Sequence, residues 1–389
     1  QRFCPPVITG LPPGSPMTDT VATGSLAGTE RLDSQSLFLL FIGLYATAIG
    51  QAFVYAILPP LGRSVGLDEI RITAIISTSA LVFTLVAPFW GRFSDQIGRK
   101  PVILIGLIGY CIGSLSFALL FSLAGDGAVT GLTLFILALI IRSLQAATMS
   151  ATNPGCTAYT ADHTVAQFRI KTLARLSSAQ SIGMITGPVM AGLVAGLGLL
   201  VPLVVASILS GLAAAIIALR LSKGVTPRAT QTYQRRLGFL DHRLRVYLIS
   251  AIGAFTGVAM VQQTLAFRLQ DALNLSGIET AQYTGWAMMV SATSILFMQV
   301  AIAQRFAGPP IQLVRWGGGL SLVGTVIISS MDGWAVVLTS MALIGAGLGL
   351  LMPAVAAGAS LAVGPEEQGG VAGLVSACPA AGFILGPIS

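Results

Sequence analysis

Long stretches without a charged residue alternate along the chain with short segments in which the charges gather. A membrane-spanning helix needs about 20 consecutive apolar residues. Two less clean spans are predicted at about 130–155, which contains Arg142, and at about 311–331, with Arg315 near its start. Uncharged runs of sufficient length lie at 34–62, 72–91, 101–125, 176–219 (two spans, divided near 196–202), 246–267, 280–304, 333–365 and 368–389. The pattern predicts eleven spans and an all-α membrane protein.

The composition agrees with this pattern. Hydrophobic residues make up 54% of the 389 residues and charged residues only 9%, whereas a soluble domain is about 25% charged. These values exclude a soluble globular protein and a disordered chain. The four cysteines lack zinc or redox spacing, and we expect them to pack in apolar surroundings. No nucleotide-binding loop or catalytic motif is present, so we expect neither an enzyme nor a bound metal or cofactor.

The basic residues indicate an orientation. With the N-terminus placed in the cytoplasm, seventeen of the 21 Lys and Arg residues fall in inner segments, three in outer loops and one, Arg142, within a span. Basic residues concentrate on the cytoplasmic side of membrane proteins. This distribution explains the net charge of +7 through anionic lipid headgroups and argues against a nucleic-acid partner.

The longest polar connection between spans, 221–244, divides them six and five. We therefore expect a disordered cytoplasmic tail over 1–36, a six-helix bundle over 37–220, a cytoplasmic central loop and a second bundle over 245–389. A repeat supports this division. Gly183-x3-Gly187-Pro188 recurs as Gly382-x3-Gly386-Pro387, and the same offset of 199 relates Pro154 to Pro353. The repeat predicts a twelfth span beyond Ser389.

The connection after the second span reads Gly91-Arg-Phe-Ser-Asp95-Gln-Ile-Gly98-Arg99-Lys100-Pro. Gly91 and Gly98 allow a tight turn between helices, and we expect Arg99 and Lys100 to anchor it at the inner headgroups. This segment resembles the signature of the major facilitator superfamily, with glutamine at position 96 where the family usually has arginine. The resemblance implies that Asp95 braces the N-terminal end of the eleventh helix in the outward-open state. A turn held by charge alone is the alternative.

The glycine row of the fifth span, which runs on to Gly192, is similar to the antiporter motif of the superfamily's drug and metabolite exporters. Small residues three or four apart allow close helix approach, and Pro188 bends the helix. The resemblance implies that Gly183, Gly187 and Pro188, with their copies Gly382, Gly386 and Pro387, act in conformational gating. Ordinary helix packing would use the same residues.

Arg142 is the one charge predicted near the middle of the membrane, about 17 Å deep. An intramembrane arginine is costly and indicates a functional site. Arg142-Ser-Leu-Gln145 also resembles the exporters' fourth-helix motif, with Ala146 in place of glycine. A structural arginine capping free carbonyls is the alternative. Further polar residues predicted to line a substrate cavity, or to bond helix to helix, are Gln51, Tyr55, Asn153, Gln180, Gln262 and Gln263.

The resemblance implies two six-helix bundles that alternate access to a central site. We expect a monomeric, multi-pass transporter of a bacterial inner membrane that exports a small amphipathic compound or metabolite by proton antiport. The alternative is an uptake symporter or facilitator for an organic anion. The spans contain no Asp or Glu, so no proton site is visible, and neutral or anionic solutes fit better than cations.

Overall fold

The structure, a computed structural model, describes residues 33–164, 166–222, 241–330 and 333–364, and positions 367, 371, 374, 375, 377–379, 381, 382 and 386. Within these ranges the regular structure is helical throughout. The helices are α1 (Ser34–Ser64), α2 (Glu69–Ile97), α3 (Arg99–Gly125), α4 (Gly131–Met149), α5 (Thr152–Asp162), α6 (Ala166–Ala195), α7 (Val201–Arg220), α8 (Arg245–Leu273), α9 (Gly277–Ala301), η1 (Ala303–Arg305), α10 (Pro310–Ser330) and α11 (Trp334–Leu361).

Ten segments of the described chain are long and apolar enough to cross a membrane, with α4 and α5 together forming one of them. They correspond to the first ten predicted spans. The fourth predicted span consists of two helices, because α4 ends at Met149 and α5 begins at Thr152. Pro154 explains the break, since its ring clashes with the carbonyl of residue 150 and it has no N–H to donate. The eleventh predicted span lies mostly outside the described residues. Of the tail predicted over 1–36, residues 1–32 lie outside them, and the last three residues belong to α1, which begins at Ser34.

Short polar motifs set several helix ends. The Asp68 carboxylate accepts a hydrogen bond from the Arg71 backbone N–H at 2.7 Å at the start of α2. Ser276 and Glu279 form a capping box at the start of α9. Gly98 separates α2 from α3 with a φ of +95°, a conformation that favours glycine. These signals keep the connections short and the neighbouring helices antiparallel.

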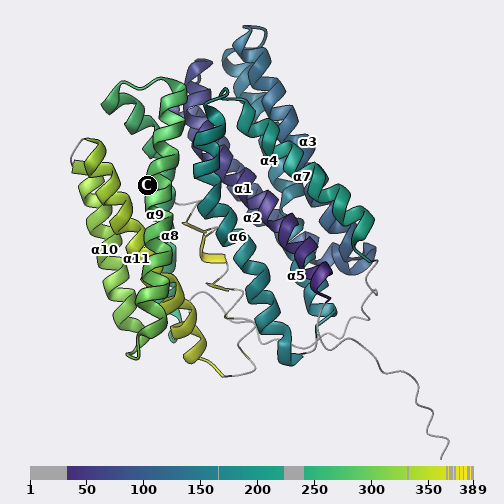
Figure 1. Cartoon of the computed structure of the whole chain (residues 1–389), viewed down its shortest axis with the longest axis vertical. Helices are drawn as coiled ribbons and strands as arrows, with labels where there is room; N and C mark the ends of the chain where they lie inside the picture. The colour runs from purple at the N-terminus through teal and green to yellow at the C-terminus, as the bar shows by residue number, and fades with distance from the viewer. Residues whose placement is uncertain are drawn as a thin grey trace, which may run out of the picture.

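Two groups of helices make up the described structure: α1 to α7, the first half, and α8 to α11, the second half (Figure 1). The Arg63 end is defined here as the end of the bundle where α1 and α6 finish and α9 begins. The Asp95 end is the opposite one, where α2 meets α3. The ribbons of α6 and α9 come together at the top of Figure 1 and spread apart toward the bottom. The halves therefore meet at the Arg63 end.

Candidate functional site

Arg142 lies in α4 and is the largest fully buried side chain of the described residues, with 1% of its surface exposed. One guanidinium nitrogen, Nη1, donates to Oε1 of Gln145 at 2.7 Å, one turn further along α4. The other, Nη2, donates to Oε1 of Gln51 in α1 at 2.8 Å. The structure thus brings together three of the residues predicted to form the site, although Gln51 and Arg142 are 91 residues apart in the sequence.

The hydrogen bonds continue outward from Arg142. Gln51 donates from Nε2 to the hydroxyl of Tyr55 at 3.0 Å. Gln145 donates from Nε2 to Oγ of Ser114 at 2.7 Å and to the carbonyl of Tyr110 at 3.3 Å, both in α3. We call Gln51, Tyr55, Tyr110, Ser114, Arg142 and Gln145 the Arg142 network. It joins α1, α3 and α4 inside the first half.

Glycines make room for this network. A Cβ atom at Gly113 would lie 2.6 Å from the Cβ of Gln145, so only glycine lets α3 approach α4 at that level. A Cβ atom at Gly50 would overlap the ring of Tyr110. Tyr110 and Ser114 were not predicted as site residues. Their spacing of four places them on one face of the third span and is the sequence signal that could have identified them.

The charge of Arg142 has no partner of opposite sign among the described residues. Its Nε is buried without a hydrogen-bond partner there, as is the Tyr110 hydroxyl. Each acidic residue of the described helices lies within three residues of a helix end: Glu69, Asp95, Asp162, Asp271 and Glu279. Leaving a buried charge unpaired is strongly unfavourable. The site can therefore gain free energy by receiving an anionic or strongly hydrogen-bond-accepting group.

A polar residue of the second half lies at the same depth as the Arg142 network. Gln263 in α8 is 3% exposed, and within the described chain neither its amide oxygen nor its amide nitrogen has a hydrogen-bond partner. Its neighbours four residues away, Ala259 and Phe267, pack toward Gly386 and toward the core of the first half. Gln263 therefore lies on the face of α8 that packs against other helices.

The depth of Gln263 follows from an ion pair. Arg63 and Asp271 are in contact, α1 and α8 run in the same direction, and Tyr55 and Gln263 each lie eight residues earlier. Both side chains are consequently about 12 Å below the Arg63 end. Gln262, the other predicted glutamine of this span, is half-buried, and its amide oxygen has no partner in the described structure.

Two predicted residues do not join the cluster. Asn153 was predicted to line the cavity or to bond helix to helix, but the break between α4 and α5 separates it from Arg142. Asn153 lies in α5, is exposed, and accepts a hydrogen bond from Thr157 at 3.3 Å. Gln180 lies half-buried in α6, and no described contact links it to the Arg142 network.

At the Arg63 end, charges and glycines hold the two halves together. Arg63 donates to both carboxylate oxygens of Asp271, at 2.6 and 2.9 Å, and to Oε1 of Gln270 at 3.2 Å. It also pairs with Glu69 of α2 and lies 4.8 Å from the ring centroid of Phe267. A sequence analysis could not have found this contact, because the residues are 208 positions apart.

Backbone contact continues from this ion pair along α6 and α9. A Cβ atom at Gly285 would lie 2.5 Å from the carbonyl oxygen of Pro188, and one at Gly192 would lie 3.2 Å from the Cα of Gln282. Real Cβ atoms do not approach other atoms within 3.0 Å. Glycine at position 285 is therefore needed for α6 and α9 to close against each other. We call this contact between α6 and α9 the seam.

At the Asp95 end, the turn between α2 and α3 bonds within the first half. Arg99 is buried between Asp95 at 2.5 Å and Asp162 at 2.8 Å. Lys100 donates to the carbonyl of Ala218 in the last turn of α7 at 2.8 Å and to that of Leu221, the residue after α7, at 2.6 Å. A cation is stabilising at a helix C-terminus. Arg99 is therefore too buried to anchor this turn at lipid headgroups, contrary to expectation, and Lys100 bonds to the end of α7. Gly91 lies within α2 with open space around it, so the prediction that it takes part in the turn was wrong and Gly98 alone has the turn conformation.

The repeated glycine motif makes the same contact in each half. Cβ atoms at Gly183 and Gly187 would lie 2.6 and 2.5 Å from the Cβ atoms of Ala48 and Ala52 in α1. Their copies Gly382 and Gly386 lie against Phe255 and Ala259 in α8. The sequence offset thus corresponds to one helix–helix contact used twice. Pro387 lies outside the described residues.

Comparison with known proteins gives a consistent picture. The model of the Major Facilitator Superfamily matches residues 40–387. Multidrug resistance protein 1 of Bacillus subtilis is 26% identical over 361 residues, 91% of this chain and 88% of that protein. Quinolone resistance protein NorA of Staphylococcus aureus is 23% identical over 367 residues, 91% of this chain and 89% of that protein.

Among solved structures, a bacterial homolog of the human lysosomal transporter Spinster in an inward-facing, occupied conformation has a TM-score of 0.74. It is 14% identical in sequence, and the match covers 91% of this chain and 80% of that one. This likeness concerns the fold.

Proposed function

Because the chain belongs to the major facilitator superfamily and is a multi-pass membrane transporter, we propose that it exports small amphipathic compounds in exchange for protons. Access to a site between the two halves alternates between the two sides of the membrane. The relatives named for multidrug and quinolone resistance support export. The excess of basic residues in segments at the Asp95 end supports a cytoplasmic location for that end and for the N-terminus.

The Arg142 network is the observation that carries the proposal on substrate class. It is a buried cation with spare donor capacity and no described counter-ion. Gln263 presents an amide at the same level from the second half. Such a site favours a neutral or carboxylate-bearing compound whose apolar body fits between helices. Quinolones carry a carboxylate, which makes them the first substrates to test.

The conformation supports loading from the cytoplasm. The halves are joined at the Arg63 end by the Arg63–Asp271 ion pair and the contact of Gly285 with Pro188. At the Asp95 end, each of the described ion pairs joins two residues of the same half: those of Asp95 and Arg99 lie in the first half and that of Arg243 in the second. This arrangement corresponds to a transporter closed to the outside.

Export is tested by fluorescent dye and quinolone accumulation in cells that make the full-length protein, with and without a protonophore. We expect lower accumulation than in cells with the empty vector, and we expect the protonophore to abolish the difference. Unchanged accumulation across a broad amphipathic panel would contradict drug export. Lower accumulation that persists with the protonophore would contradict proton coupling but not export.

Uptake of an organic anion is the second candidate, and the unpaired charge of Arg142 favours it. Counterflow in vesicles of known orientation separates the two functions. Accumulation of quinolone in everted vesicles on acidification of the lumen supports export. Proton-driven accumulation of an organic anion only in right-side-out vesicles supports uptake.

The Asp95→Asn protein is expected to transport about fivefold more slowly, because a carboxylate at a helix N-terminus contributes up to about 1 kcal/mol. We propose that this contact forms with the eleventh helix when the Asp95 end closes. In the present conformation Asp162 still holds Arg99, so folding should be unaffected. Initial rates in vesicles, corrected for protein amount, test this. A normal rate would contradict the role of Asp95, and Asp126→Asn in an exposed loop is the control.

The Asp271→Arg protein is expected to open more often at the Arg63 end, because two guanidinium groups then face each other. The contact is partly exposed, so a loss of about 1 kcal/mol, or a fivefold population shift, is expected. Distances between spin labels at Leu197 and Ile278 report the opening. The doubly reversed protein, Arg63→Asp with Asp271→Arg, should regain the short distance. If neither variant changes the distance distribution, the ion pair does not hold the halves.

A further inference from the structure

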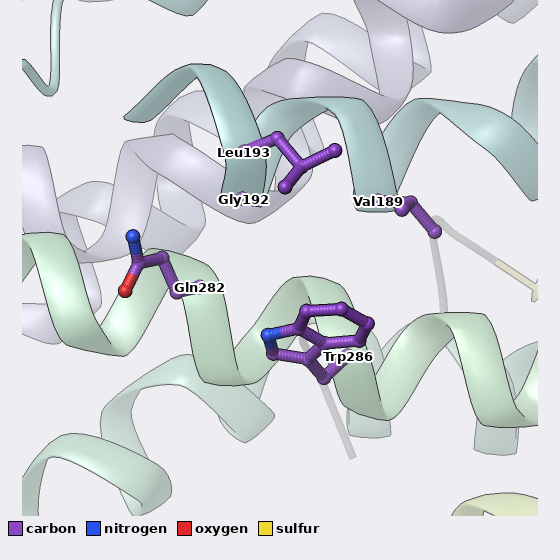
Figure 2. A pocket seen from close by; sticks show the side chains of 5 residues that line it. All are labelled: Val189, Gly192, Leu193, Gln282 and Trp286. Atoms are coloured by element: carbon purple, nitrogen blue, oxygen red, sulfur yellow. The ribbon is translucent and has the colours of Figure 1, made fainter. Parts of the chain in front are cut away.

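A small pocket of about 220 Å³ lies on the seam between the two halves, apart from the Arg142 network (Figure 2). Val189, Gly192 and Leu193 of α6 form one wall, and Gln282 and Trp286 of α9 form the other. Figure 2 shows Leu193 and Val189 facing the ring of Trp286 across the seam, with Gln282 at one end. Neither half contains the pocket by itself.

Two side chains of the pocket are exposed at the surface of the bundle, Leu193 by 59% and Trp286 by 47%. Both lie in segments long and apolar enough to cross a membrane, so we infer that they face lipid. A molecule dissolved in the membrane can therefore reach the pocket without passing through water. Trp286 fits an interfacial aromatic belt by its position in the sequence, and the pocket gives its ring a second role.

The lining defines the chemistry of a ligand. A cavity of about 150 Å³ lined by apolar side chains accommodates benzene, so this pocket has room for one aromatic ring with a short substituent. The indole of Trp286 offers a flat surface for stacking. The amide of Gln282 is half-buried and has no hydrogen bond to another described residue that would compete with a ligand. The pocket suits an aromatic ring that carries one hydroxyl or amide group.

The pocket depends on the conformation of the seam. Gly192 lies against the backbone of Gln282, and Gly285 lies against Pro188, so the two walls stay together only while the Arg63 end is closed. Separation of α6 and α9 would move Val189 and Leu193 away from Trp286. A ligand that touches both walls binds the closed seam and stabilises it.

We propose that the pocket is an inhibitory site for small aromatic amphiphiles that enter from the bilayer, bridge α6 and α9, and hold the Arg63 end closed. The inhibition rests on the proposed alternating access, whereas binding does not. Transport substrates interact with the Arg142 network, and the inhibitory ligand occupies a separate site. At ten times its Kd, such a ligand lowers the population of the open state about tenfold.

Binding is measured by fluorescence quenching in purified full-length protein in lipid nanodiscs. Trp90→Phe, Trp316→Phe and Trp334→Phe leave Trp286 as the one remaining tryptophan of four. The probe is 4-bromobenzyl alcohol, whose bromine quenches indole on contact. We expect a saturable quenching component above the linear one that arises from partition into lipid. Linear quenching alone would overturn the proposal.

Two variants locate the site. Val189→Phe fills the pocket and should remove the saturable component, whereas Leu197→Phe, at an exposed position beyond α6, should retain it. Gln282→Leu should weaken binding of 4-bromobenzyl alcohol about tenfold but leave binding of bromobenzene unchanged, since only the alcohol bonds to the amide. Saturable binding with an unchanged Kd in both Val189→Phe and Gln282→Leu would place the site elsewhere.

Inhibition is measured separately, as the quinolone transport rate in proteoliposomes. 4-Bromobenzyl alcohol at ten times its Kd should slow transport about tenfold in the wild-type protein and leave the Val189→Phe protein unaffected. Equal slowing of both proteins would indicate a bulk membrane effect and overturn the inhibitory role. If the wild-type protein transports no quinolone, the proposed function fails while the quenching result still decides whether the pocket binds the probe.

Discussion

Replacing Arg142 with alanine is expected to lower transport about 100-fold while the protein still reaches the membrane. Removing a charge that makes buried hydrogen bonds to its partner costs about 2–5 kcal/mol of interaction, and each 1.4 kcal/mol corresponds to a factor of ten. The loss falls on the bound carboxylate or acceptor group of the substrate. Folding should suffer less, because Arg142→Ala also removes an uncompensated buried charge.

Matched variants separate charge from geometry. Arg142→Lys keeps the charge but cannot reach Gln51 and Gln145 with two parallel donors, so an intermediate rate is expected. Arg71→Ala removes a surface arginine at the start of α2 and should transport normally. Initial quinolone rates and thermal stability are measured for each purified protein. A normal rate for Arg142→Ala would leave the arginine a purely structural role.

The Gly285→Val protein is expected to lose closure at the Arg63 end and to transport at least tenfold more slowly. Its Cβ would lie 2.5 Å from the backbone carbonyl of Pro188, and neither backbone can yield as a flexible side chain could. Overpacking of this kind costs about 1–3 kcal/mol, and a cost of about 2 kcal/mol shifts a two-state equilibrium about thirtyfold.

Spin labels at Leu197 and Ile278 measure this effect directly. The Gly285→Val protein should show the long distance in most molecules, whereas Gly319→Val should match the wild-type distribution. Gly319 lies in α10 with no atom within 4 Å of its Cβ position, so the same change there meets open space. A short distance and normal transport in Gly285→Val would show that the seam opens and closes elsewhere.

The membrane spans could be predicted because hydrocarbon tolerates few charges, so each span leaves a gap of about 20 residues in the charge pattern. Arg142 could be identified for the same reason, because a charged side chain inside the membrane is costly. The break after α4 was not predicted, although Pro154 is visible in the sequence. The charge pattern marks where a span lies, but it does not show whether one helix runs through the span without interruption.

The partners of each polar residue could not be predicted in the same way. Lys100 could bind headgroups or helix carbonyls with similar chemistry, and only packing places α7 beside it. Tyr110 and Ser114 join Arg142 through Gln145 because α3 and α4 approach at a glycine. Long-range contacts such as Arg63 with Asp271 depend on how the halves dock, and the local pattern carries no record of that.

The Arg63–Asp271 contact has a consequence for the environment of the cell. The side chains of Asp271 and Glu69 are 65% and 56% exposed, so dissolved ions reach them. The Debye length falls from about 10 Å at 0.1 M salt to about 3 Å at 1 M. With the Arg63 end facing outward, the ionic strength of the surrounding medium would set how firmly the resting transporter is shut, and cells in brine and in fresh water would hold the same protein at different points of its cycle.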